Sequence, residues 1–217
     1  MFEREWEEST NVRDLLNYLY HTRAVHQTGT GRRLLRLYGC ASCRRVWHLV
    51  PDGACRRAVE LAEAYADGQA AKAVLRKALK AAAPFLHAGP GAVNRSAVQA
   101  VFYAAAPDAL RVTQAGPFAS AALHDGGTTD DGDFCHRLRD MFGNPFRPVG
   151  LDPAWRTPTV TALAVGIYEQ RAFDRMPILA DALQEAGCEN EDVLDHCRGD
   201  GPHARGCWVV DAILGKR

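Results

Sequence analysis

Two clusters of cysteine and histidine are the features of this sequence that point most directly to chemistry. The stretch DHCRGDGPHARGCW, residues 195–208, holds two histidines and two cysteines within fourteen positions, and CASC places Cys40 and Cys43 three residues apart. Thiolate sulfur and imidazole nitrogen are the ligands that zinc prefers in proteins. The question is therefore whether the two clusters share a metal ion or only fill a core.

Helical spacing would let each cluster present two ligands together. Residues three or four apart lie on one side of a helix, so two crossing helices could build a tetrahedral zinc site of three cysteines and one histidine. The predicted metal ligands are Cys40, Cys43, His203 and Cys207, with His196 and Cys197 as alternates. The alternative is that these cysteines are small, buried and inert side chains that let helices approach closely.

The same C-terminal segment supports an enzymatic alternative, a zinc- or cysteine-dependent, hydrolase-like enzyme. Three protein ligands and an open position would let zinc activate a water, with Asp195 or Asp211 as the carboxylate close in sequence, of which Asp211 shares the predicted helix face of Cys207. A thiol nucleophile needs a histidine beside it, and Cys197 with His203 across the RGDGP turn is the pair that fits. The candidate catalytic residues are His196, Cys197, His203 and Asp211. Because the sequence holds no HExxH motif and no HxE with PCxxC, a structural zinc is favoured over an enzyme.

A weaker alternative is nucleic-acid binding through the arginine-rich helix predicted over Arg32–Arg45. Its five arginines, at positions 32, 33, 36, 44 and 45, could contact phosphates. They spread around the helix without interleaved exposed aromatic residues, and the chain carries 26 basic and 26 acidic side chains, for a formal net charge of zero. We therefore expect a solvated helix face here rather than a nucleic-acid partner.

Composition places the chain among cytoplasmic proteins with a substantial core. Hydrophobic residues make up 47% of the sequence, and the seven cysteines are an odd number, which is more typical of a reducing compartment than of a disulfide framework. The acidic start MFEREWEEST lacks the basic and apolar regions of a signal peptide. No stretch approaches the ~18 consecutive apolar residues that cross a membrane.

The elements that must position the clusters follow a helical period almost throughout. Apolar residues recur at i, i+3, i+4 and i+7, and Ser, Thr, Asn, Gly and Pro mark the ends of the segments. Helices are predicted near 12–20, 32–50, 54–67, 69–83, 133–142, 158–173, 177–186, 191–197 and 202–216. The last of them would align His203 with Cys207. The only ambiguous strand-like run is CWVV. The sequence thus predicts an all-α, compact multi-helix domain of roughly nine to eleven helices, with the N- and C-terminal motifs packed together.

One segment interrupts this helical pattern. HDGGTTDDGD, residues 124–133, is polar, acidic and glycine-rich and has no apolar period. We expect a single helical domain over residues 1–217, with a soft boundary at this segment.

Several longer motifs also carry a resemblance. At CASCRRVWHL, GNPFRPV, FDRMPILADALQEAGC and HCRGDGPHARGCWVVD, the chain resembles a planctomycete-type family of bacterial proteins without an established function. The resemblance covers most of the chain outside residues 89–132, and it implies a shared fold but no mechanism. Together with the missing catalytic motifs, it leads us to expect a non-enzymatic interaction or scaffold module with a structural zinc, whose partner is another protein.

Overall fold

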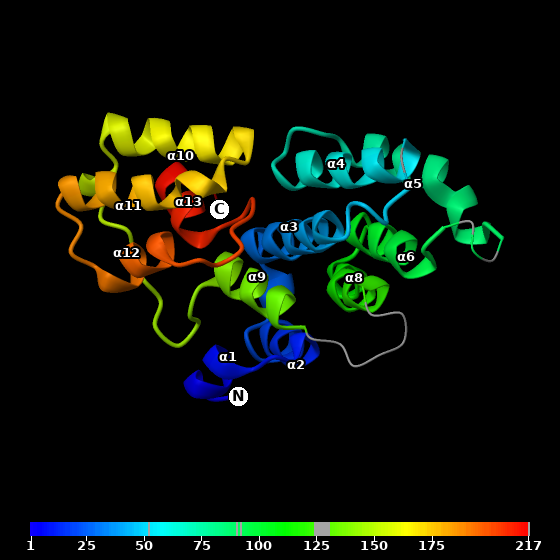
Figure 1. The fold of residues 1–217 in the computed structure, drawn as a ribbon, viewed down its shortest axis with the longest axis horizontal. Helices are drawn as coiled ribbons and strands as arrows, with labels where there is room; N and C mark the ends of the chain where they lie inside the picture. The colour runs from blue at the N-terminus through cyan, green and yellow to red at the C-terminus, as the bar shows by residue number, and fades with distance from the viewer. Residues whose placement is uncertain (52, 90, 92, 124–130, 217) are drawn as a thin grey trace. The chain divides into compact units, whose positions relative to one another are not determined.

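Regular structure in this protein is entirely helical over the part of the chain that the structure describes. The computed structural model describes residues 1–51, 53–89, 91, 93–123 and 131–216, and it contains α-helical segments α1 to α13 joined by shorter 3-10 and π turns (Figure 1). No strand occurs among these residues, and CWVV is helical from Trp208. None of the described helices is long and apolar enough to cross a membrane. The predicted all-α class of nine to eleven helices is confirmed.

The chain divides into two compact units. Unit 1 comprises Met1–Cys135 and unit 2 comprises His136–Arg217, so the division falls within α9 (Gly132–Phe142). The predicted soft boundary at 124–133 lies just before this division, although residues 124–130 are outside the described residues. That the chain forms a single domain stays a prediction.

Unit 1 is built around its longest helix, α3 (Gly29–Arg45). The other helices of this unit are α1 (Glu3–Glu8), α2 (Val12–Asn17), α4 (Ala54–Ala66), α5 (Lys72–Ala82), α6 (Arg95–Ala104), α7 (Ala109–Val112) and α8 (Ala115–Leu123). Helix α3 packs against α4, α6 and α8. Close approach requires a glycine here, because a Cβ on Gly39 would lie 3.2 Å from both the Cα of Ala104 and the Cβ of Ala115.

Helix α3 also places the first cysteine cluster. Thr28 caps its start by accepting a hydrogen bond from the Gly31 N–H, so the helix begins before the predicted residue 32. Cys40 and Cys43 are both fully buried on it, and the Cys40 thiol contacts the carbonyl oxygen of Val59 on α4 at 3.8 Å. Within unit 1, these cysteines pack as small apolar side chains at the α3–α4 contact.

Unit 2 has its own hydrophobic core. Beyond the end of α9, its helices are α10 (Pro158–Gln170), α11 (Met176–Glu185), α12 (Glu191–Arg198) and α13 (Trp208–Leu214). The side-chain oxygens of Thr157 and Asn190 cap α10 and α12, as expected for these residue types. In Figure 1, α10 and α11 lie side by side, and both helices contact one another and further helices of this unit. The core includes Val160, Ile167, Leu179, Leu183, Val193, Val209 and Ile213.

The last helix begins later than the sequence predicts. It starts at Trp208 rather than at Pro202, and residues 199–207 form a loop with a turn at Arg205 and Gly206. Gly206 has φ +98°, a conformation that side-chain-bearing residues rarely adopt and that breaks the predicted helix. The expected alignment of His203 with Cys207 on one helix face is therefore wrong.

Candidate metal centre

Four side chains of unit 2 bring metal-binding atoms to one point. Asp140 comes from α9, His196 from α12, His203 from the loop 199–207, and Cys207 from the residue that precedes α13. One ligand atom from each of these residues lies within 4.8 Å of the other three. A carboxylate, two imidazoles and a thiol together form a donor set that zinc accepts.

The distances between these atoms are close to those of a tetrahedral site. The Oδ1 atom of Asp140 lies 2.7 Å from Nδ1 of His203 and 3.2 Å from Nε2 of His196. The same Nε2 atom is 3.2 Å from Sγ of Cys207. Metal–ligand bonds of about 2.0–2.3 Å give a tetrahedron with edges of roughly 3.3–3.6 Å. The two contacts of His196 are thus near the required edge, whereas the Asp140–His203 contact must lengthen by roughly half an ångström or more.

Helix ends hold the ligands in place. Asp140 lies in the last turn of α9, which ends at Gly143 with φ +62°, and His196 lies in the last turn of α12. The backbone N–H of Ala204 donates to Oδ2 of Asp140 at 3.0 Å. Because this bond occupies Oδ2 and both rings face Oδ1, Asp140 is arranged to bind a metal through one oxygen only.

Because the group is buried, its net charge determines which ion it can bind. The side chains of Asp140, His203 and His196 are 4%, 7% and 18% exposed, and Cys207 is fully buried. An ion with two positive charges would balance one carboxylate and one thiolate to a net charge of zero. Neutral balance matters because an uncompensated charge in a protein interior is expensive. The group is therefore suited to a divalent cation rather than to a monovalent one.

Proton affinities in the group follow from burial and contact. Burial alone would raise the pKa of the Asp140 carboxyl, but hydrogen bonds with His196 and His203 outweigh it and hold that pKa below its ordinary value. Burial and the adjacent Asp140 carboxylate raise the pKa of the Cys207 thiol well above its ordinary value. A metal ion that takes the thiolate would have to displace this proton, as zinc does at cysteine ligands.

His203 has a second ring nitrogen that nothing in the described chain satisfies. Its Nε2 atom is buried without a hydrogen-bond partner, while Nδ1 faces Asp140. A buried polar atom without a partner costs about 1–3 kcal/mol, so native proteins seldom keep one without a reason. This ring nitrogen is therefore open to a further partner, in addition to the contact that Nδ1 makes with Asp140.

The geometry does not favour a thiol enzyme. In a nucleophile–histidine–carboxylate triad, the nucleophile and the carboxylate contact opposite nitrogens of the histidine ring. Here Cys207 and Asp140 both face Nε2 of His196. Burial and the nearby Asp140 carboxylate raise the pKa of Cys197 to about 12, which is opposite to the activation that a catalytic thiol needs.

The remaining predicted site residues lie outside this group of four. His203, Cys207 and the alternate ligand His196 belong to it, whereas Cys197 and Asp211 are buried in unit 2 but are not members of the group. Cys40 and Cys43 belong to unit 1. A metal shared by these two cysteines with His203 and Cys207 would join both units, and it stays a prediction.

Asp140 is the ligand that the sequence analysis missed. In DFCHRLRDMFG it stands among the buried Leu138 and Met141, near the C-terminal end of a helix, where a negative charge is unfavourable. An acidic residue on an apolar face at the wrong end of a helix is the signal that could have identified it.

The arginines of the arginine-rich helix form ion pairs or hydrogen bonds within unit 1. Arg33, Arg44 and Arg45 form ion pairs with Asp67, Glu63 and Asp133, while Arg32 and Arg36 donate to backbone carbonyl oxygens. These contacts do not favour phosphate binding, because each arginine already uses part of its guanidinium group within the unit.

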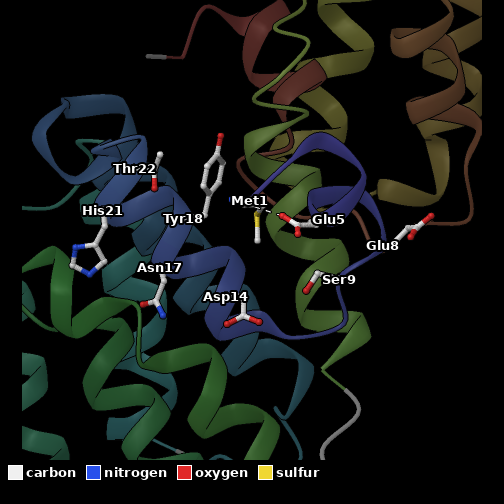
Figure 2. A pocket seen from close by; sticks show the side chains of 9 residues that line it. All are labelled: Met1, Glu5, Glu8, Ser9, Asp14, Asn17, Tyr18, His21 and Thr22. Carbon is white, nitrogen blue, oxygen red and sulfur yellow. Dashed lines mark ion pairs between the residues drawn. The ribbon is translucent and has the colours of Figure 1, made fainter.

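A hollow of about 830 Å³ in unit 1 carries less chemistry than its residues suggest. Figure 2 shows the side chains of α1, α2 and the π turn (Tyr18–Thr22) that line it, including Glu5, Glu8 and Asp14. Glu5 accepts a hydrogen bond from the Phe2 N–H, and Glu8 pairs with Arg4. Since its acidic groups are exposed and two of them already have partners, nothing in this hollow singles out a ligand.

Comparisons with known proteins leave the metal centre as the principal guide to function. No family model, no curated protein and no solved structure matches the chain.

Proposed function

We propose that this protein is a non-enzymatic helical module that binds one zinc ion in unit 2. The proposed ligands are Oδ1 of Asp140, a ring nitrogen of His196, a ring nitrogen of His203, and Sγ of Cys207. The observation that carries the proposal is the convergence of four zinc-type donors within 4.8 Å in a largely buried place. Two anionic and two neutral donors would leave a zinc-bound site without net charge.

The proposed role of the ion is structural. Four protein ligands would complete a tetrahedron, which is typical of structural zinc sites, whereas catalytic sites keep a position for water. The ion would connect the end of α9 to the end of α12 and the start of α13, and α9 lies far from the other two in the sequence. Closing such long loops with a metal adds to the stability of the folded chain. Another protein as the partner of this module is part of the proposal.

Elemental analysis of the full chain, purified without a histidine tag, tests the proposal. We expect about one zinc per chain, and competition with a chromophoric chelator would measure its affinity. Asp140→Asn and Cys207→Ser should each lower zinc affinity by at least roughly 100-fold, because each removes a charged ligand. Asp140→Asn retains an oxygen that accepts the Ala204 N–H. A loss of zinc affinity in this variant would therefore be caused by the missing carboxylate charge and not by a broken hydrogen bond.

Matched controls separate ligand loss from general damage. His136, an exposed histidine one turn before Asp140 on α9, and Cys188, a buried cysteine in the core of unit 2, lie outside the group of four. His136→Ala and Cys188→Ser should retain full zinc content. Zinc-free protein that also fails to take up zinc or cobalt at micromolar concentrations would contradict the proposal, and so would equal zinc loss in ligand and control variants.

A further inference from the structure

The loop 199–207 carries two of the proposed ligands, and an arginine between these ligands binds the end of a helix. Arg205 lies between His203 and Cys207 in the sequence. Its Nε and Nη2 atoms donate to the carbonyl oxygens of Tyr168 and Glu169, each at 3.1 Å. Its guanidinium group also stacks over the Tyr168 ring, 5.3 Å from the ring centre.

The C-terminal end of α10 provides carbonyl oxygens that accept hydrogen bonds from this arginine. The last four carbonyl groups of an α-helix have no partner within the helix. At α10, the Ile167 carbonyl is taken by the N–H groups of Arg171 and Ala172, where the chain turns through a left-handed residue. The next two carbonyls, of Tyr168 and Glu169, are the ones that Arg205 binds. A cation at a helix C-terminus is also favoured by the helix dipole.

Two anchors therefore fix the loop between the ligands. Asp140 holds Ala204 through its backbone N–H, and α10 holds Arg205 through its side chain. Gly206, at φ +98°, then turns the chain so that Cys207 follows. His203 directly precedes the two anchored residues and Cys207 follows them after Gly206, so the positions of both ligands depend on these two contacts.

We infer that Arg205 is a positioning residue of the metal centre, which holds His203 and Cys207 in place for the ion without binding it. The inference rests on the proposed function. Removing groups that orient metal ligands typically lowers metal affinity by roughly 10–100-fold. We expect a loss of that size for Arg205→Ala. Arg205→Lys should lose less, because an ammonium group can bind one of the two carbonyls but lacks the planar guanidinium.

Arg156 provides a matched control. Its Nη2 atom donates to the carbonyl oxygen of Ala212 at 2.8 Å, near the C-terminal end of α13 and away from the loop 199–207. Arg156→Ala thus removes the same kind of contact in the same unit. It should leave zinc affinity within about threefold of the unmodified chain, a much smaller effect than the loss of an orienting group.

The test combines three measurements on the full chain and its Arg205→Ala, Arg205→Lys and Arg156→Ala variants. Chelator competition gives the zinc affinity. The cobalt-substituted chain gives the thiolate-to-metal absorption band, which should keep its wavelength in Arg205→Ala because the ligands are unchanged. Hydrogen–deuterium exchange without added metal should become faster over residues 199–207 in Arg205→Ala but not in Arg156→Ala.

Each outcome decides the inference. An unmodified chain that binds zinc, together with an Arg205→Ala variant that binds it equally well or loses no more affinity than Arg156→Ala, would overturn the positioning role alone. A shifted cobalt band in Arg205→Ala would also overturn it, since the ligand set would have changed. An unmodified chain that binds neither zinc nor cobalt would overturn the proposed function and, with it, this inference.

Discussion

At the scale of single residues, the cysteines differ in their surroundings but share their burial. All seven are free and buried, in the cores of both units. Burial raises the pKa of Cys55 to about 11, and burial with the Asp140 carboxylate raises that of Cys197 to about 12. Because the thiolate is the reactive form, a raised pKa lowers reactivity at neutral pH.

A thiol titration tests the burial that the seven cysteines share. We expect almost no reaction with a disulfide reagent at pH 7.5 in the folded chain and seven thiols after denaturation in guanidinium chloride with a chelator. Raising the pH to 9 should activate Cys55 and Cys197 little, since the thiolate fraction of a group with a pKa near 11 or 12 stays at about 1% or less. A single fast-reacting thiol that disappears in Cys197→Ser would instead support the cysteine-enzyme alternative.

The site residues were predictable where their types carry chemistry by themselves. His196, His203 and Cys207 were identified from their residue types and from the number of histidines and cysteines in this short stretch. The reason given for pairing His203 with Cys207 was wrong. A glycine-turned loop brings them together instead of one helix face. Asp140 could not be placed by proximity in sequence, because the fold alone brings it beside residues some sixty positions later.

At the scale of elements, helix α3 is joined to α4 by an ion pair as well as by apolar packing. Arg44 binds Glu63 through two hydrogen bonds, of 2.6 and 2.8 Å, and Glu63 is almost fully buried. The hydrogen bond and the charge of Glu63 outweigh the effect of burial and raise the pKa of Arg44. Arg44 also stacks over Trp47, which fixes the guanidinium plane.

Breaking this pair should destabilise unit 1 measurably. Glu63→Ala leaves the half-buried Arg44 without its carboxylate, and we expect a loss of about 2–4 kcal/mol in the free energy of unfolding by urea titration. Glu60→Ala is the control on the same helix, because its contact with Arg57 is exposed and should contribute less than about 1 kcal/mol. Similar losses in both variants would indicate that the buried pair contributes no more than a surface one.

Element boundaries were predictable where local chemistry dictates them. Thr157 and Asn190 cap predicted helices as their residue types suggest, and the period of apolar residues located α3, α4 and α10. Helix α3 nevertheless begins earlier and ends earlier than predicted, and α13 begins six residues later. Periodicity cannot detect a loop whose residues happen to keep helical spacing, as those between Pro202 and Cys207 do.

At the scale of the whole molecule, the division into two units distinguishes what the two metal hypotheses require. The group of four lies entirely within unit 2, whereas the hypothesis drawn from spacing requires Cys40 and Cys43 of unit 1. A metal held within one unit stabilises that unit directly, and a metal shared between units would couple both. The two hypotheses therefore differ in where zinc slows amide exchange.

Hydrogen–deuterium exchange of the full chain, with and without one equivalent of zinc, separates the two hypotheses. We expect zinc to slow exchange in α9, α12, the loop 199–207 and α13, and to leave the α3 segment around Cys40 and Cys43 unchanged. The variant Cys40→Ser should then bind zinc as tightly as the unmodified chain, while Cys207→Ser should not. The alternative predicts that zinc slows exchange in α3 as well. It also predicts that Cys40→Ser and Cys207→Ser weaken zinc binding to the same extent, and that the double variant binds little worse than either. Both results together would show that the ion joins both units through the cysteines of CASC.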